Sequence, residues 1–170
     1  MPKFVPNSIE VNNGVVIIRV VSRKYGEQFV YADECDLELI QKHQWHVRAS
    51  RDGNGLYAAT QTPHNGGQKP IKMHRMLMGH PDNEVDHCDL NGLNNRRANL
   101  REATRSQNAA NVAILKTNTS GFKGVSWSRS HKRWQVTLCG KNLGRYLDIN
   151  QAATVYRNAA IERYGEFARF

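Results

Sequence analysis

Alternating and β-branched apolar positions dominate the first part of the chain and predict strands. Residues 8–32 contain the apolar positions Val15–Ile18, Val20 and Val21, and Asn12-Asn13-Gly14 just before them has the composition of a hairpin turn. Asp33 stands where it would cap a short helix over Glu34–His43, in which apolar residues recur at helical spacing. We therefore expect a β-hairpin region followed by a short helix.

The pattern continues with short elements up to about residue 80. We expect two strands joined by a loop, then a second loop, a third strand and a short helical turn. In chain order these are Trp45–Ala49, the loop Arg51–Gly55, Leu56–Thr60, the loop Pro63–Gly67, Lys69–His74 and Arg75–Met78.

Residues 84–110 form a distinct unit with the order strand, loop, strand, helix. Glu84–Cys88 and Leu100–Ala103 have the pattern of short strands, and the loop between them is rich in Asn, Asp and Gly. Thr104 and Gln107 have the spacing of a capping box, so a helix is expected to begin at about Arg105.

The C-terminal part of the chain predicts three strands and one longer helix. A polar hinge at Thr117–Gly121 precedes them. Gly140-Lys141 is expected to make the last tight turn, and Asn150 to cap a helix that reaches about Tyr164. Alanines on one face of this helix would let it lie close to the sheet. The strands are expected over Val125–Arg129, Arg133–Cys139 and Asn142–Leu147.

The charge of the chain indicates what kind of partner it binds. The 170 residues have a formal net charge of +9 and a pI near 9.7. Residues 1–90 hold 10 basic and 11 acidic side chains, whereas residues 91–170 hold 14 basic and 4 acidic ones. Because the excess is confined to one half, nucleic acid is a better explanation than a merely soluble basic surface.

Composition also excludes several classes of protein. No apolar run approaches the roughly 18 residues that span a bilayer, and the N-terminal segment has no charged-then-apolar signal layout. The three cysteines, Cys35, Cys88 and Cys139, are far apart and form no CxxC pair. They argue against a disulfide framework and against a zinc site of paired thiolates. We expect a cytoplasmic protein of phage or bacterial type, with no membrane partner.

The strongest chemical signal is Val85-Asp86-His87, followed by Asn99 and Asn108. Asp86 and His87 end a predicted strand, and Asn108 lies in the first turn of the helix expected to pack on it. A carboxylate and an amide oxygen are hard ligands that suit Mg²⁺ or Mn²⁺. His87, with an ordinary pKa of about 6.5, can take a proton from water at neutral pH. Adjacent strand residues point to opposite faces, so Asp86 and His87 share a cleft only if the strand ends or bulges there.

The segment VDHCDLNGLNNRRANLREATRSQN resembles the HNH endonuclease family, whose core is a ββα-metal finger. It is similar to the homing-type branch of phages and introns in residue identity and spacing. The resemblance implies that Asp86 and Asn108 hold one divalent cation, Mg²⁺ or Mn²⁺. It also implies that His87 is the general base, and that Asn99 ties the loop across the finger and orients the His87 ring.

The same resemblance implies hydrolysis of a phosphodiester bond to a 5′-phosphate and a 3′-hydroxyl. The cation would stabilise charge on the phosphate while His87 deprotonates water on the opposite side. Arg101 and Arg105 flank the site and would clamp the phosphate, or serve as ordinary backbone contacts or solvated charges. His74, which precedes the segment, is interpreted as a structural, hydrogen-bonded histidine.

Residues 119–170 resemble an AP2-type DNA-binding domain of the kind fused to phage HNH enzymes. The resemblance rests on the Gly124-Val125 start, the strand with Trp134, Leu143-Gly144 and the alanine-rich helix. It implies that three strands lie in the major groove of DNA with the helix behind them. The outer face holds mostly Ser, Thr, Cys and Asn where plant relatives carry arginines and a tryptophan, so base contacts do not transfer. Specificity for the DNA sequence is expected to come from Gln135 and Thr137 and from DNA shape.

Strand alternation assigns the two faces of this sheet. The residues expected to pack on the helix are Val125, Trp127, Trp134, Val136 and Leu138; those expected to face outward are Ser126, Ser128, Gln135, Thr137 and Cys139. The residues expected to contact nucleic acid are Arg96, Arg97, Arg101, Lys123, Arg129, Lys132, Arg133, Gln135, Thr137, Lys141 and Arg145.

The expected fold is α+β. A β-rich scaffold region (1–80) precedes the catalytic ββα-metal finger (81–112), a linker (113–120), and a three-stranded antiparallel sheet packed on one helix (121–170). The scaffold is favoured over a DNA-contacting role for the first region, although Arg19, Arg23, Lys24, Arg48 and Arg51 could contact DNA.

The function expected is a metal-dependent, homing-type endonuclease acting on double-stranded DNA, with His87, Asn99 and Arg105 as catalytic residues. One finger holds one active site, so a monomer would nick and a homodimer, or a second event, would cut both strands. The alternative is a non-catalytic DNA-binding regulator with a degenerate finger, against which the intact motif argues. RNA cleavage is disfavoured because a sheet in the major groove suits B-form DNA.

Overall fold

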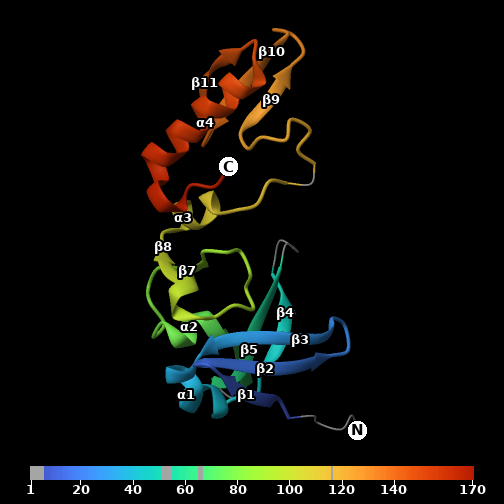
Figure 1. The fold of residues 1–170 in the computed structure, drawn as a ribbon, viewed down its shortest axis with the longest axis vertical. Helices are drawn as coiled ribbons and strands as arrows, with labels where there is room; N and C mark the ends of the chain where they lie inside the picture. Colours follow the sequence, from blue (N-terminus) through green and yellow to red (C-terminus); the bar gives the residue numbers. More distant parts are fainter. Residues whose placement is uncertain (1–5, 51–54, 65–66, 116) are drawn as a thin grey trace. The chain divides into compact units, whose positions relative to one another are not determined.

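The computed structural model describes residues 6–50, 55–64, 67–115 and 117–170. The chain divides into two compact units, Met1–Ala103 and Thr104–Phe170, which are described one at a time below (Figure 1). Several small antiparallel sheets and a few helices make up these units, so the chain is of mixed α and β structure. Among the described residues, no helix has the length and apolar character needed to cross a membrane.

The first unit holds three antiparallel sheets, in the strand orders β1-β2-β3, β4-β5-β6 and β7-β8. Its strands are β1 Ser8–Asn12, β2 Val15–Ser22, β3 Gly26–Asp33, β4 His46–Ala49, β5 Leu56–His64, β6 Gly67–Lys72, β7 Glu84–His87 and β8 Leu100–Ala103. Its helical segments are η1 Glu34–Asp36, α1 Leu37–Gln41, α2 Met73–Leu77 and η2 Arg97–Asn99.

The hairpin predicted at the start of the chain is confirmed. Asn12 pairs with Val15, and the two turn residues Asn13 and Gly14 have φ angles of 49° and 78°. Positive φ at both positions is typical of the tight turns whose twist matches the flanking strands. The alternation on β2 then buries Val16 and its neighbours at i+2 and i+4.

One hydrophobic core joins the first two sheets, both short helices and a residue of the later loop. Side chains of β2 and β3 pack with Ile40, Trp45, Met73 and Leu93. Trp45 is fully buried, and its indole Nε1 donates a hydrogen bond to the Ile40 carbonyl at 3.0 Å. The participation of Leu93 shows that the loop after β7 is packed on the N-terminal region.

Three expectations for the first unit were wrong in detail. Asp33 precedes η1 but makes no side-chain cap; its carboxylate instead accepts hydrogen bonds from the segment after β7. β5 continues through Pro63 to His64, where a loop was expected. α2 begins at Met73, so His74 lies in a helix rather than a strand. Arg51–Asn54 of the predicted loop lie outside the described residues.

The second unit begins with α3 Arg105–Ala110 and continues as a three-stranded antiparallel sheet with one long helix. The capping box is confirmed: Thr104 accepts from the Gln107 backbone, and the Gln107 side chain accepts from the Thr104 backbone. The remaining elements are β9 Val125–Ser128, β10 Arg133–Leu138, β11 Lys141–Tyr146, α4 Ile149–Tyr164 and η3 Gly165–Phe167.

Small residues bring α4 close to the sheet, as its alanine spacing predicted. Ala152, Tyr156 and Ala160 are buried against Val125 and Val136. The backbone at Gly124, which has a φ of 68°, runs so close that a Cβ there would lie 2.1 Å from the Tyr156 ring. A glycine is therefore needed at the start of β9 for this packing.

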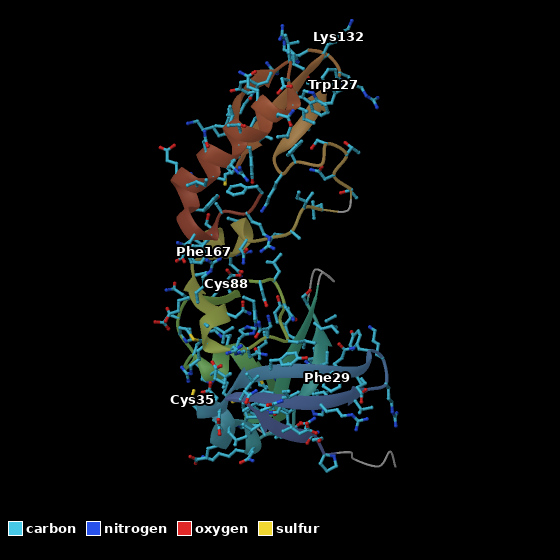
Figure 2. The ribbon with its side chains drawn as sticks, viewed as in Figure 1. Phe29, Cys35, Cys88, Trp127, Lys132 and Phe167 are labelled. Atoms are coloured by element: carbon cyan, nitrogen blue, oxygen red, sulfur yellow. The ribbon has the colours of Figure 1, made fainter. Side chains whose placement is uncertain are left out.

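Three local expectations for the second unit were also wrong. The turn between β10 and β11 uses Cys139 and Gly140, since Leu138 pairs with Lys141. The helix cap is Asp148, whose carboxylate accepts from the Gln151 backbone N–H at 2.7 Å. Trp127 pairs with Trp134 on the helix-facing side, yet it is 47% exposed. Figure 2 shows its position near the end of the β9–β10 hairpin, together with Lys132.

Candidate active site

The pair Asp86 and His87 lies at the end of β7 and is buried. Their exposed fractions are 4% and 5%. Asp86 pairs with Arg101 and His87 with Leu100 in the two-stranded sheet with β8. Consecutive strand residues point to opposite faces, so the two side chains meet different neighbours, described in turn below.

Asp86 is held by a charged hydrogen-bond pair from the opposite strand. Arg101 donates from Nε at 3.0 Å and from Nη2 at 2.9 Å, both to Oδ2 of the carboxylate. The side-chain exposures are 16% for Arg101 and 4% for Asp86. At this depth an ion pair is screened weakly by solvent, so each partner depends strongly on the other.

The His87 ring lies in a cluster of three rings from three different elements. The ring centroids of His74 on α2 and His87 are 4.7 Å apart, in an edge-to-face arrangement. Tyr57 on β5 lies 5.5 Å from the first ring and 5.6 Å from the second. Aromatic contacts at these distances restrict the orientation of each ring.

One ring nitrogen of His87 faces the side chain of Asn95. The fully buried Asn95 places its amide oxygen 3.4 Å from Nε2 of His87. An amide oxygen only accepts, so this contact is a hydrogen bond in the tautomer that carries the proton on Nε2. In the neutral ring the lone pair is then on Nδ1, the nitrogen that would take a proton.

Both histidines of the cluster are held in the neutral form. Burial lowers the pKa of His74 from 6.5 to about 2, and the positive charges of Lys72 and Arg75 act in the same direction. Burial also lowers the pKa of His87, although the hydrogen bond with Asn95 and the charges of Asp89 and Asp86 oppose it. Nδ1 of His74 is buried and has no hydrogen-bond partner among the described residues, contrary to the expected hydrogen-bonded histidine.

Asn99 closes the loop between β7 and β8. Its Nδ2 donates to Asp89 Oδ1 at 2.9 Å and to the Asn94 carbonyl at 2.8 Å, and its Oδ1 accepts from the Asp89 backbone at 3.0 Å. The Asn94 amide also donates to the Asp89 carboxylate. These bonds hold the base of the loop that carries Asn95.

The N-terminal sheet holds the same loop from outside. The Tyr31 N–H donates to the Leu93 carbonyl at 2.9 Å, and the Asn95 N–H donates to the Tyr31 carbonyl at 2.7 Å. A short parallel bridge is thus added to β3. The fixed backbone on both sides of residue 94 positions the Asn95 side chain toward His87.

Arg96 and Arg97 anchor the end of this loop. The Asp33 carboxylate accepts from Arg96 Nε at 3.1 Å and from the Arg97 backbone at 2.7 Å. The guanidinium of Arg97 binds both oxygens of Asp36, at 2.7 and 3.1 Å. Three arginines expected to contact DNA, these two and Arg101, are therefore placed in ion pairs within the first unit.

The basic residues of the second sheet are placed differently. In the described part of the chain, none of the following takes part in a salt bridge: Arg129, Lys132, Arg133, Lys141 and Arg145. All five are exposed. On the outer face Arg145 donates from Nε to Gln135 Oε1 at 3.3 Å, which links two of the residues expected to contact DNA. Thr137 pairs with Asn142 beside a β-bulge.

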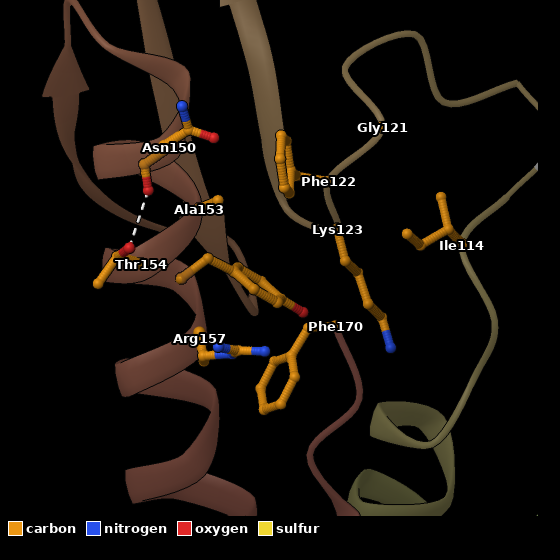
Figure 3. A pocket seen from close by; sticks show the side chains of 10 residues that line it. Ile114, Gly121, Phe122, Lys123, Asn150, Ala153, Thr154, Arg157 and Phe170 are labelled. Carbon is orange, nitrogen blue, oxygen red and sulfur yellow. Dashed lines mark hydrogen bonds between the residues drawn. The ribbon is translucent and has the colours of Figure 1, made fainter.

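Lys123 lies in a cavity of the second unit instead of on its sheet face. Its Nζ donates to the carbonyls of Ala110 and Val112, at 2.5 and 2.8 Å. The cavity, of about 360 Å³, is lined by aromatic side chains and by Arg157, which stacks on Phe170 (Figure 3). Burial lowers the pKa of Lys123. Through these two hydrogen bonds Lys123 stabilises the end of α3 and the segment that follows it.

The remaining expected site residues lie on α3, in the second unit. Asn108 is half-buried and Arg105 is exposed. The boundary between the units falls between β8 and α3, so the ββα arrangement and the pairing of Asp86 with Asn108 stay predictions. Among the described residues there is no cluster of three or more His, Cys, Asp or Glu that could hold a metal ion.

Sequence reasoning missed Asn95, Tyr57 and Lys72. Asn95 was one of several asparagines in a polar loop, with nothing in the local pattern to distinguish it. Tyr57 and Lys72 come from strands distant in sequence, and the ammonium of Lys72 lies 4.5 Å from the Tyr57 ring centroid. Only the fold brings them to His87.

Comparison with known proteins gives consistent results. An HNH endonuclease family model matches residues 75–110. Protein 3.8 of Escherichia phage T7 is 42% identical over 90 residues, which cover 51% of this chain and 74% of that protein. An uncharacterized HNH endonuclease of Acanthamoeba polyphaga mimivirus, L560, is 40% identical over 88 residues, 49% of this chain and 44% of that protein. No solved structure matches.

Proposed function

Since the chain belongs to the family of phage T7 protein 3.8 and carries an HNH endonuclease domain at residues 75–110, we propose that it is a homing-type, metal-dependent DNA endonuclease. One observation carries the proposal. His87 is buried, burial lowers its pKa, and the Asn95 amide oxygen lies 3.4 Å from Nε2, so the tautomer that donates to Asn95 has its lone pair on Nδ1. A histidine prepared in this way is suited to accept a proton.

The proposed chemistry is general-base hydrolysis of a phosphodiester bond. Nδ1 of His87 takes a proton from the attacking water, and the ring cluster with Tyr57 and His74 keeps the imidazole in place. Asn99 acts on His87 indirectly, because it holds the loop that carries Asn95. Arg105 is proposed as a phosphate contact. Products with a 5′-phosphate and a 3′-hydroxyl are part of this proposal.

A divalent cation would be held by Asp86 and Asn108. A carboxylate and an amide offer hard oxygen donors, so the donor chemistry fits Mg²⁺ or Mn²⁺. When bound, the cation would stabilise negative charge on the phosphate. Arg101 fixes the Asp86 carboxylate through Oδ2 and thereby sets its orientation.

The second unit is proposed to bind the DNA in the manner of an AP2-type domain. Residues 104–170 hold 11 basic and 3 acidic side chains. The exposed cations of the sheet form no salt bridges within the described residues, whereas Arg96, Arg97 and Arg101 of the first unit do. Cations that are not neutralised within the chain attract phosphates most strongly. Gln135, linked to Arg145, is proposed to read base edges.

Cleavage of supercoiled plasmid and of phage or host genomic DNA tests the proposal. We expect the protein with Mg²⁺ or Mn²⁺ to nick DNA, and His87→Ala to bind DNA normally without cutting it. His80→Asn, which replaces an exposed histidine that the proposal does not use, is the matched control and should cut normally. DNA binding without cutting by the unaltered protein under both ions would instead favour the non-catalytic regulator.

A further inference from the structure

The sheet β4-β5-β6 carries exposed basic side chains on the same face as Tyr57, which packs against the His87 ring. Strand register places His46, Ala59 and Lys72 in one row and Arg48 beside Tyr57 in the next. His46, Arg48 and Lys72 are exposed, whereas Val47 and Ala58 on the other face belong to the core. The three strands contain no Asp or Glu. The strands themselves therefore contribute positive charge and no negative charge to this face.

Tyr57 connects this face to His87. The Lys72 ammonium lies 4.5 Å from the centroid of the Tyr57 ring, a distance typical of a cation–π contact. The same ring lies 5.6 Å from the His87 ring. A Cβ on Gly92 would lie 2.4 Å from Tyr57, so the loop after β7 presses the tyrosine against its neighbours. The Tyr57 ring therefore contacts both the Lys72 ammonium and the His87 ring.

The electrostatic effect of Lys72 is consistent with this position. Its positive charge acts on both histidines of the ring cluster and lowers the pKa of each. An exposed ammonium has up to three donors and is well suited to a phosphate oxygen. The cation–π contact orients its stem and reduces the entropy lost on binding.

We propose that Lys72 binds a DNA phosphate next to the bond that His87 hydrolyses, and that the exposed basic side chains on this face of β4-β5-β6 are part of the substrate-binding surface. The N-terminal region would then contribute to substrate binding as well as supporting the loop. This inference rests on the proposed endonuclease function and adds to it a substrate-contacting residue outside the matched segment 75–110.

The test is single-turnover cleavage of a duplex that contains a mapped cut site. Lys72→Met keeps an apolar stem over Tyr57 but removes the charge, and Lys72→Arg restores a charge. Lys69→Met is the matched control, because Lys69 is an exposed lysine of the same strand whose side chain faces the other side. We expect Lys72→Met to cut about tenfold more slowly, Lys72→Arg to recover most of the rate, and Lys69→Met to match the unaltered protein.

A second measurement identifies the phosphate. Each phosphate near the cut is replaced in turn by an uncharged methylphosphonate, and affinity is measured without a divalent ion. The affinity difference between the unaltered protein and Lys72→Met should disappear at one phosphate adjacent to the cut. A difference that persists at every phosphate, or equal cutting by Lys72→Met and Lys69→Met, overturns the assignment of Lys72 alone. If the unaltered protein cuts no DNA, the proposed function fails and the assignment fails with it.

Discussion

Asp86 and Arg101 face each other across the β7-β8 pair, and two nitrogens of the arginine donate to the same carboxylate oxygen. The carboxylate proposed to hold a cation is therefore already fixed by a side chain from the neighbouring strand. The position of Oδ2 is determined by protein contacts, which is the usual way in which outer partners orient a metal ligand.

Arg101→Ala is expected to lower the free energy of unfolding by about 3 kcal/mol, because it leaves the charge of Asp86 buried without its cation. Chemical denaturation measures this change. Arg19→Ala, from the exposed pair with Glu27, is the control and should cost less than about 1 kcal/mol. A further Asp86→Asn substitution should recover part of the loss; if the two substitutions are simply additive, the ion pair is not what stabilises the sheet.

The pH dependence of cleavage should reflect the neutral state of His87. Burial lowers the pKa of this residue from 6.5. The neutral, proton-accepting form therefore persists below that value. Single-turnover rates should be constant above a midpoint that lies below pH 6.5, and should fall about tenfold per pH unit beneath it. A midpoint above pH 6.5 would contradict a buried His87 as the base.

Acid should destabilise the protein through His74. Its pKa is about 2 in the folded chain and 6.5 ordinarily. The unfolded chain therefore binds a proton as the pH falls below 6.5 while the folded chain does not. Stability is complete above pH 6.5 and is lost on acidification by about 1.4 kcal/mol per pH unit for this group.

Denaturation of His74→Gln at several pH values tests this linkage. The slope of unfolding free energy against pH should decrease by about one proton in the variant. His46→Gln, which removes an exposed histidine, is the control. An unchanged slope in His74→Gln would show that other groups cause the acid sensitivity.

Gly92→Ala should damage the site through Tyr57. The added methyl would lie 2.4 Å from both the Leu56 carbonyl oxygen and the Tyr57 ring, so backbone or ring must move. We expect a loss of about 1–3 kcal/mol in unfolding free energy and slower cleavage at saturating DNA. Gly55→Ala, where a Cβ meets no atom of the described residues within 4 Å, is the control. Equal behaviour of the two variants would rule out a tight contact at Gly92.

Lys123→Met should weaken the second unit without affecting DNA binding. The substitution removes two hydrogen bonds to the carbonyls of Ala110 and Val112. We expect about 1–2 kcal/mol less stability and an unchanged salt dependence of DNA affinity. Lys141→Met should show the opposite result, with normal stability and a salt slope reduced by about one. A reduced salt slope in Lys123→Met would restore the original expectation of a DNA contact.

Local signals in the sequence were reliable where the structure is local. The Asn13-Gly14 turn, the Thr104–Gln107 capping box and the alanine face of α4 depend on neighbours within a few residues, and each was predicted. Trp127 shows the limit of such patterns. Alternation gave the correct face of the sheet for Trp127. The strand sequence does not show how far along the sheet α4 extends, so the exposure of Trp127 could not be predicted.

The surroundings of His87 could not be predicted for a related reason. Asp33 had the composition of a helix cap, but it binds Arg96 and Arg97, more than 60 positions away in the chain. Asn95 gains its role because β3 fixes the backbone on both sides of it. The motif contains the residues proposed to be reactive, whereas their orientation depends on contacts that no short pattern contains.

The ties from β3 and η1 to the loop affect how this motif could be transplanted. A graft limited to residues 81–112 would carry Asp86, His87 and Asn95 to a new host protein without Asp33, Asp36 or Tyr57. In the graft, His87 would lack β3, which holds the backbone around Asn95, and it would lack the Tyr57 ring that packs against it. A segment that could be transferred with the proposed hydrolytic site intact therefore has to include the N-terminal sheets.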